Sequence, residues 1–192
     1  MDMDTLKASA DDACWDNDST IASYRLPLPA RGIFLYKLRV KRLLQGIPSD
    51  QIGQVGHYKT ATSPDSHIAC FKHAVDFLVP DGTAVIAMRE GVIEEIHDDS
   101  HSFGDGPQFR NQLNYLTISH TNLETSQYCH LLKNSVKKLG LKVGDQVKEG
   151  QLIGRVGKTG WTDRDHLHVI VFTPNAKLPF GFKSLKIRWR NH

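Results

Sequence analysis

The sequence predicts a mainly β fold, a compact antiparallel β-sheet domain with few short helices. The first observation is a series of short runs rich in β-branched residues, at residues 74–79, 83–88 and 91–96. Turn-forming residues separate these runs, as in consecutive strands joined by tight turns. The second is residues 140–160, where six glycines punctuate short strands. The third is that no helical pattern longer than a turn or two follows residue 50, residues 135–139 being the best candidate.

The chain before this series divides into an arm and a connecting region. Residues 1–22 carry many Asp residues and little hydrophobic periodicity, which predicts a loose N-terminal arm. Within residues 23–66, the alternation at residues 34–40 predicts a strand, and residues 46–66, rich in Gly, Pro, Ser and Asp, predict a long loop. Residues 67–192 are expected to form the main domain with a C-terminal tail.

Three further strands complete the predicted sheet. A polar loop at about residues 98–113 precedes them. Residues 115–120 and 126–132 are expected to form two strands, and residues 166–172 are expected to form the last. This last strand begins His-Leu-His and continues as an apolar run. It therefore carries two histidines at the start of a strand whose other residues are expected to be buried.

Composition excludes several classes of protein. A length of 192 residues suits one domain with an extension. The net charge of +3 is too small to predict a nucleic-acid groove, and no apolar stretch approaches the roughly 20 residues of a membrane span. The N-terminus is acidic and polar, so no signal peptide is visible. Cys14, Cys70 and Cys129 are an odd, sparse set that predicts no disulfide framework.

The strongest local signal for chemistry is His166-Leu167-His168. Side chains at i and i+2 of a strand point to the same face, about 6.5–7 Å apart along it. Two imidazoles on one face can take different roles: one can bind a metal, and the other can reach a water held by that metal. The alternative is a pair of surface histidines on an edge strand.

Asp76 and His130 give weaker signals. Asp76 lies among apolar residues of a predicted strand, and a buried carboxylate needs a partner, a metal or water. His130 is expected on a strand, sharing a face with Tyr128, while Cys129 should point into the core. Each of these residues alone is more simply explained by solvent or a structural hydrogen bond. Together with the His-Leu-His pair they suggest a His/Asp/His zinc site with an open position for water.

Residues 67–172 resemble the lysostaphin/LytM-type zinc metallopeptidases, which cut peptidoglycan cross-links. The matching blocks occur in the family's order: S-H at 66–67, A-V-D-F-x-x-P-x-G-T at 74–83, N-Y-L-T-I-S-H at 114–120, Y-C-H-L at 128–131, V-G-D-x-V-x-x-G-Q-x-I-G at 143–154 and H-L-H at 166–168. The resemblance implies a groove over the sheet that holds one Zn²⁺ per chain. It further implies a zinc metalloendopeptidase acting on peptidoglycan peptides outside the cytoplasm. We expect a monomer, and the long loop directly before the proposed metal strand predicts that residues 23–66 pack on or cover the groove.

Residue roles follow from the same resemblance. Asp76 and His168 match metal ligands, and His130 and His166 match the catalytic pair. His120 matches a recurrent position that has neither role, and Asn114 is a candidate for hydrogen-bonded support. The residues before the last motif, Asp163-Arg164-Asp165, depart from the small residues and Pro usual in the family, so the fit of a substrate at that wall of the groove differs.

The first zinc ligand is either His67 or His73. The commoner family spacing, His-x-x-x-Asp, places Lys72 at this position. His73 is three residues before Asp76, so on a continuous strand it would face the opposite side. His67 can reach the side of Asp76 only if the intervening residues loop back. One branch of the family has a similarly long spacing between its His and its Asp. His67 is therefore the expected ligand, ahead of His73 and of Cys70.

Two other classes of function compete with the enzyme. A relative that has lost zinc and acts as a wall-binding or regulatory module would lack some of the ligand and catalytic residues, whereas this chain retains the full set. A lipoyl or biotinyl carrier domain, which the Gly-rich segment also resembles, needs a modifiable Lys typically flanked by Met. No Met-Lys-Met occurs, which excludes the carrier.

Overall fold

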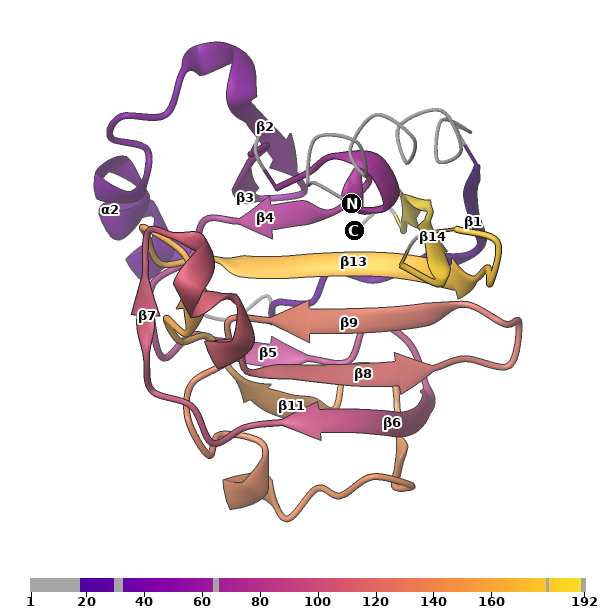
Figure 1. The fold of residues 1–192 in the computed structure, drawn as a ribbon. Helices are drawn as coiled ribbons and strands as arrows, with labels where there is room; N and C mark the ends of the chain where they lie inside the picture. The colour runs from indigo at the N-terminus through magenta and orange to yellow at the C-terminus, as the bar shows by residue number, and fades with distance from the viewer. Residues whose placement is uncertain (1–17, 30–32, 64–65, 179, 191–192) are drawn as a thin grey trace.

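A large antiparallel sheet dominates the computed structural model, which describes residues 18–29, 33–63, 66–178 and 180–190 (Figure 1). Its strands are β2 (Ile52–Val55), β3 (Tyr58–Ala61), β4 (Val75–Phe77), β6 (Gly91–His97), β8 (Tyr115–Ser119), β9 (Thr125–Cys129), β10 (Gln146–Val147), β13 (Leu167–Pro174) and β14 (Phe182–Ser184). They are ordered β10-β6-β8-β9-β13-β4-β3-β2, and β14 pairs with β13. The mainly β, antiparallel prediction is confirmed.

Short pairs of strands and a few helical turns complete the described fold. The pairs are β5 (Ala84–Ile86) with β11 (Leu152–Arg155), β7 (Phe103–Gly104) with β12 (Gly160–Trp161), and β1 (Ser19–Tyr24) with β15 (Lys186–Trp189). The helices are α2 (Ile33–Leu43) and the 3₁₀ turns η1 (Ser49–Gln51), η2 (Ala69–Phe71), η3 (Pro107–Gln112) and η4 (Lys137–Leu139). Among the described residues, no helix is long and apolar enough to cross a membrane.

The core lies on one face of the large sheet, where β5 and β11 run behind it (Figure 1). Along β13, Leu167, Val169 and Val171 alternate into this core and are fully buried. Each such side chain stabilises the fold by about 1.5–3 kcal/mol. Because strand side chains alternate, His168 is turned to the opposite face of the sheet.

The predicted strand at residues 34–40 is wrong, because this segment lies within helix α2. Tyr36 and Val40, four residues apart, both pack towards the core, so the apolar spacing is that of a helix. Lys41 and Arg42 fall in the last turn, where positive charge is favourable. Mixed apolar and basic residues at 34–40 fit either period, and packing of the apolar face selects the helix.

The N-terminal arm and the long loop are also more ordered than predicted. Residues 1–17 of the arm lie outside the described residues, but Ser19–Tyr24 form β1 and pair in parallel with β15. Residues 46–66, expected as a loop, contain the hairpin of β2 and β3, which extends the large sheet beyond β4. Part of this region is therefore integral to the sheet.

A buried carboxylate fastens β1 to the domain. Glu124, only 1% exposed, precedes β9 and accepts hydrogen bonds from the backbone N–H of Ile21 and the hydroxyl of Tyr24, the latter at 2.9 Å. Asn122 donates to the same carboxylate. Since hydrogen bonds to charged acceptors are worth more than neutral ones, this carboxylate should contribute substantially to docking β1.

We therefore expect Glu124→Ala to lower the free energy of unfolding by about 2–3 kcal/mol, because it leaves buried donors unsatisfied. Urea denaturation followed by circular dichroism measures this change. Glu94→Ala, at an exposed position of β6, is the matched control and should change stability by less than about 0.5 kcal/mol. Equal midpoints for the two variants would show that Glu124 does not hold β1.

Candidate active site

The site is built on the pairing of β4 with β13. The two strands are antiparallel, and Asp76 lies directly opposite His168 in the register. Paired residues project from the same face of a sheet, so the two side chains meet on the face away from the core. His168 Nδ1 lies 2.8 Å from Asp76 Oδ1, within hydrogen-bond distance.

His67 reaches the same carboxylate from the turn before η2. The backbone N–H of His67 donates to the carbonyl of Ser63 at 2.8 Å. The chain then loops back through η2 into β4 and places His67 Nε2 3.1 Å from Asp76 Oδ2. The predicted loop-back is therefore present, and the His67 ring packs edge-on against the His168 ring, with centroids 5.2 Å apart.

These three residues form a group that can hold a metal ion. Their ligand atoms all lie within 4.8 Å of one another. The ligands of a tetrahedral zinc, each bound at about 2 Å, lie about 3.4 Å apart, close to the two measured separations. Both ring nitrogens of His67 are buried without a hydrogen-bond partner among the described residues. A buried imidazole without hydrogen bonds fits a metal ligand, and the N/O donor set suits Zn²⁺.

His130 enters the site because it leaves the strand geometry. Strand β9 ends at Cys129, and His130 has φ of +60°, in the left-handed region that non-glycine residues rarely adopt. Tyr128 faces the core, where its hydroxyl accepts from the N–H of Met88. The prediction that His130 shares the face of Tyr128 is therefore wrong, because the left-handed residue breaks the strand alternation.

Cys129 is also placed differently from the prediction. It is buried, but it lies opposite His168 in the register of β9 and β13 and therefore on the site face rather than in the main core. Burial and the nearby Asp76 carboxylate raise the pKa of its thiol, so the side chain stays neutral. Cys129 is not a member of either group of candidate metal ligands in the described part of the chain.

His130 and His166 form a pair beside the candidate ligands. Their ring centroids are 4.4 Å apart, and His166 Nε2 lies 3.8 Å from Asp76 Oδ1. His130 Nδ1 donates to the carbonyl of Thr159 at 2.7 Å, and His166 Nδ1 donates to the carbonyl of Arg164 at 3.1 Å. Because a carbonyl only accepts, each neutral ring keeps its hydrogen on Nδ1 and leaves Nε2 able to accept a proton.

Supporting residues hold His130 through a buried network. The Asn114 N–H donates to Thr159 Oγ1 at 3.1 Å, and that hydroxyl donates to the carbonyl of Leu131, which also accepts from Asn114 Nδ2. Asn114 therefore has the supporting position expected from the sequence. The role of Thr159 was not foreseen; its place in the Gly-rich run just before the last strand was the available signal.

Electrostatics in the site favour a charged Asp76 and neutral imidazoles at His130 and His168. Burial alone would raise the pKa of Asp76, but the neighbouring His166 and His168, together with the hydrogen bond from His168, hold it well below its ordinary value. Burial lowers the pKa of His130 well below its ordinary value, and neighbouring imidazoles add to the effect. Burial also lowers the pKa of His168, against the opposing pull of Asp76. Neutral imidazoles are the form that binds metal or accepts protons.

The remaining histidines lie outside this cluster. His73 is in neither group of candidate ligands within the described residues. His57 and His101 are exposed, and His192 lies outside the described residues. His97 ends β6, where its ring stacks on Tyr115. His120 is buried and bonded to the Glu90 carbonyl and Ser126 Oγ, a structural position.

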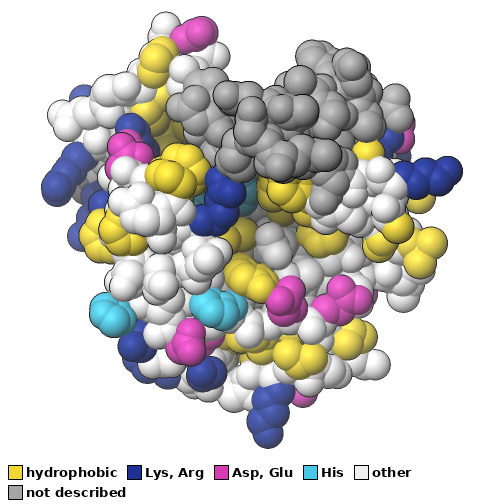
Figure 2. All heavy atoms as spheres, viewed as in Figure 1, with side chains coloured by type: hydrophobic (Ala, Val, Ile, Leu, Met, Phe, Trp, Pro, Cys, Tyr) yellow, Lys and Arg dark blue, Asp and Glu magenta, His cyan; other side chains and the backbone are white. Residues whose placement is uncertain are grey.

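Most of the site side chains are nearly buried, since His67, Asp76, His130 and His166 are 7–8% exposed. Figure 2 views this face of the molecule, where Lys or Arg side chains lie beside hydrophobic ones near the centre. The second group of candidate ligands, His130, His166 and His168, shares one residue with the first. A metal held by His67, Asp76 and His168 would therefore have the two remaining imidazoles beside it.

The sequence profile of peptidase family M23 matches residues 70–178, more than half of the chain. The chain belongs to peptidase family M23. This places it among metallopeptidases, which are hydrolases, and confirms the resemblance to lysostaphin/LytM-type enzymes. The metal that the family implies fits the His67, Asp76 and His168 donors described above.

Named M23 relatives come from several bacteria. The chain is 36% identical over 93 residues to the peptidoglycan DD-endopeptidase ShyC of Vibrio cholerae, covering 48% of this chain and 18% of ShyC. It is 36% identical over 96 residues to lysostaphin of Staphylococcus staphylolyticus, covering 50% of this chain and 17% of lysostaphin. The matches thus span less than a fifth of each relative.

A solved M23 structure shows a similar, partial overlap. The lysostaphin catalytic domain of Staphylococcus simulans is 30% identical, with a TM-score of 0.41 over 53% of this chain and 66% of that domain.

The first zinc ligand can be tested by substitution. We expect His67→Ala to lose bound zinc and His73→Ala to retain it, because His67 Nε2 faces Asp76 whereas His73 belongs to neither ligand group. Inductively coupled plasma mass spectrometry of the purified variants measures the ratio of zinc to protein. Zinc retained in His67→Ala and lost in His73→Ala would reverse the assignment.

Proposed function

We propose that this chain is a zinc-dependent endopeptidase that hydrolyses peptide bonds of peptidoglycan, in the stem peptide or the cross-bridge. The observation that carries the proposal is the group His67, Asp76 and His168 with the Nε2 atoms of His130 and His166 directed to the same face. The names of the M23 relatives, a peptidoglycan DD-endopeptidase and lysostaphin, support the substrate class.

The proposed roles of the site residues follow from the hydrogen bonds that each residue makes. His67, Asp76 and His168 would hold one zinc, which when bound lowers the pKa of water and polarises the scissile carbonyl. Asp76 stays ionised, so it supplies negative charge to the ligand set, and the 2.8 Å separation of Asp76 Oδ1 from His168 Nδ1 brings these two donor atoms together.

His130 and His166 would carry the proton transfers. Each ring has Nδ1 committed to a backbone carbonyl, so Nε2 is the atom that takes a proton from water, returns it to the leaving amine or donates to the developing oxyanion. Burial keeps His130 neutral, which suits a base in the resting state. The 4.4 Å separation of their ring centroids supports joint action of both imidazoles on one substrate bond.

The proposal extends to compartment and domain organisation. Peptidoglycan lies outside the cytoplasm, and Cys70 is disulfide-bonded, as is usual in oxidising compartments. We further propose that residues 67–192 form the catalytic unit, that residues 23–66 pack against its groove, and that the monomer is active.

Metal removal tests the proposed mechanism. We expect about one zinc per chain and loss of cell-wall hydrolysis when a chelator removes it, with recovery on adding Zn²⁺. Release of soluble muropeptides from purified cell walls, analysed by mass spectrometry, measures hydrolysis and identifies the bond cut. Full cleavage by metal-free protein would contradict the mechanism, and a zinc-loaded protein that binds walls without cleaving them would favour a binding or regulatory module.

Substitution of the catalytic pair separates chemistry from metal binding. We expect His130→Ala and His166→Ala each to lower kcat by roughly 10²–10⁴-fold while about one zinc per chain remains, because these rings act on protons rather than on the metal. His101→Ala, at an exposed position, is the control and should keep full activity. Stoichiometric loss of zinc from either variant would assign that histidine to the metal instead.

A further inference from the structure

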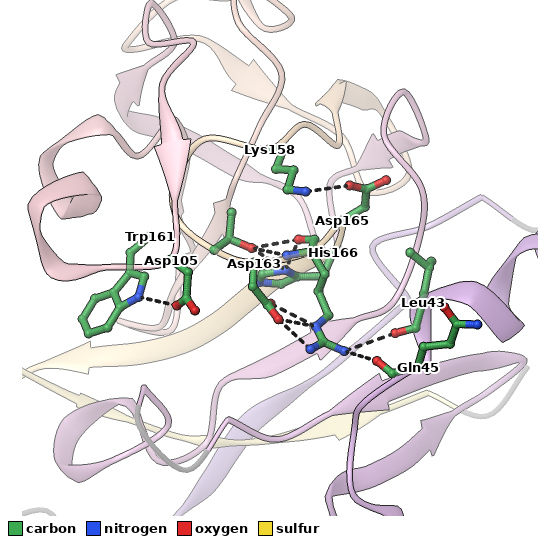
Figure 3. A network of polar contacts seen from close by, with 10 residues as sticks. Leu43, Gln45, Asp105, Lys158, Trp161, Asp163, Asp165 and His166 are labelled. Atoms are coloured by element: carbon green, nitrogen blue, oxygen red, sulfur yellow. Dashed lines mark hydrogen bonds and ion pairs between the residues drawn. The ribbon is translucent and has the colours of Figure 1, made fainter.

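Arg164 joins two parts of the molecule that are distant in sequence. Its guanidinium donates from Nη1 to the carbonyl of Gln45 at 3.2 Å and to that of Leu43 at 3.4 Å, at the C-terminal end of α2 (Figure 3). The same group donates from Nε and Nη2 to the Asp163 carboxylate, at 2.6–3.1 Å. Arg164 thus connects the loop before β13 with the helix.

The position and shape of the Arg164 guanidinium suit the end of a helix. The carbonyl end of a helix carries partial negative charge, which favours a cation there. At the end of the helix, backbone N–H groups donate to the carbonyls of Val40, Arg42 and Leu44. Arg164 donates to the carbonyls of Leu43 and Gln45, which none of these N–H groups uses. Because the guanidinium is a rigid fork held on one side by Asp163, its remaining donors point in a fixed direction.

The backbone of Arg164 touches the catalytic pair. Its carbonyl accepts from His166 Nδ1 at 3.1 Å and from Thr162 Oγ1 at 2.8 Å, and its N–H donates to the same hydroxyl at 3.3 Å. This carbonyl keeps the hydrogen of His166 on Nδ1 and Nε2 free. One residue therefore binds the helix with its side chain and orients His166 with its backbone.

The two catalytic histidines depend on different supports. His130 is held by the carbonyl of Thr159 within the buried Asn114 network. The support of His166 lies instead in a partly exposed loop, where the Arg164 side chain retains 28% of its surface. Only the second support reaches α2 in the described structure. A change at the helix should therefore affect His166 and leave His130 in place.

We propose that Arg164 is a positioning residue through which α2 holds His166 in the tautomer and orientation required for proton transfer. The role rests on the proposed peptidase function, but its structural part, the state of the His166 ring, does not require turnover. It gives α2, which lies outside the M23 match at residues 70–178, a direct effect on the chemistry of the site.

The test uses the full-length, zinc-loaded protein and the substitution Arg164→Lys. Lysine keeps the charge but lacks the fork, so it cannot hold Asp163 and both helix carbonyls together. Arg188→Lys is the matched control, because Arg188 also donates to a backbone carbonyl, that of Ile21 at 3.3 Å, but on β15. Both variants are compared for zinc content, melting temperature, kcat, KM and the ¹⁵N resonances of the histidine rings.

For Arg164→Lys we expect kcat to fall by about 10–100-fold with KM nearly unchanged, as for a misplaced catalytic group. The His166 ring resonances should shift towards a mixture of tautomers, those of His130 should stay, and zinc content and melting temperature should match the parent. Arg188→Lys should leave every readout unchanged.

Three results would overturn the proposal. Unchanged His166 resonances and kcat would show that Arg164 has no positioning role. A raised KM with unchanged kcat would make Arg164 a substrate contact instead, and equal effects on His130 would indicate a general structural role. If the parent protein shows no turnover, the proposed function fails, while the His166 resonances still decide the role of Arg164.

Discussion

A carboxylate buried at the centre of an antiparallel sheet must have partners, and the rest of this site follows from that requirement. Asp76 lies on β4 directly opposite His168 on β13, so the register itself supplies the first partner. The turn through η2 supplies the second, His67, on the other carboxylate oxygen. Any slip of one residue between β4 and β13 would turn Asp76 or His168 to the core face, where an unpaired charge is costly.

The catalytic pair requires departures from regular strand geometry. His130 faces the candidate ligands because it adopts φ of +60° directly after β9, and a backbone strained in this way is held by its surroundings. Here the Thr159 carbonyl and the buried Asn114 network hold it. His166 precedes β13 and depends on a loop whose side chains reach α2. Thus the metal group is built on paired strands, and the proton-transfer groups are built at strand ends.

The sequence predicts the parts of the site that depend on local periodicity. Alternation along an apolar strand places His168 on the face away from Leu167, and the cost of burying Asp76 requires partners. The absence of a regular strand pattern before Asp76 indicates that His67 could loop back. These inferences depend only on residues close together in the sequence, and the structure places these side chains accordingly.

The sequence does not predict features set by long-range contacts. Residues 34–40 fit a strand or a helix, and packing of Tyr36 against Tyr58 and the core selects the helix α2. The left-handed conformation of His130 has no signature in Tyr-Cys-His-Leu, so strand alternation misplaced both His130 and Cys129. The contact of Arg164 with Leu43 spans 121 residues, and no local pattern indicates such a partner.

The central claim, that Asp76 unites one metal site, is tested most directly by crystals of the zinc-loaded protein measured on both sides of the zinc absorption edge. The account predicts one anomalous peak per chain, in contact with His67 Nε2, Asp76 and His168 Nδ1, and with neither His130 nor His166 as a ligand. A peak held by His130, His166 and His168 without Asp76, or one bound through His73, would contradict it.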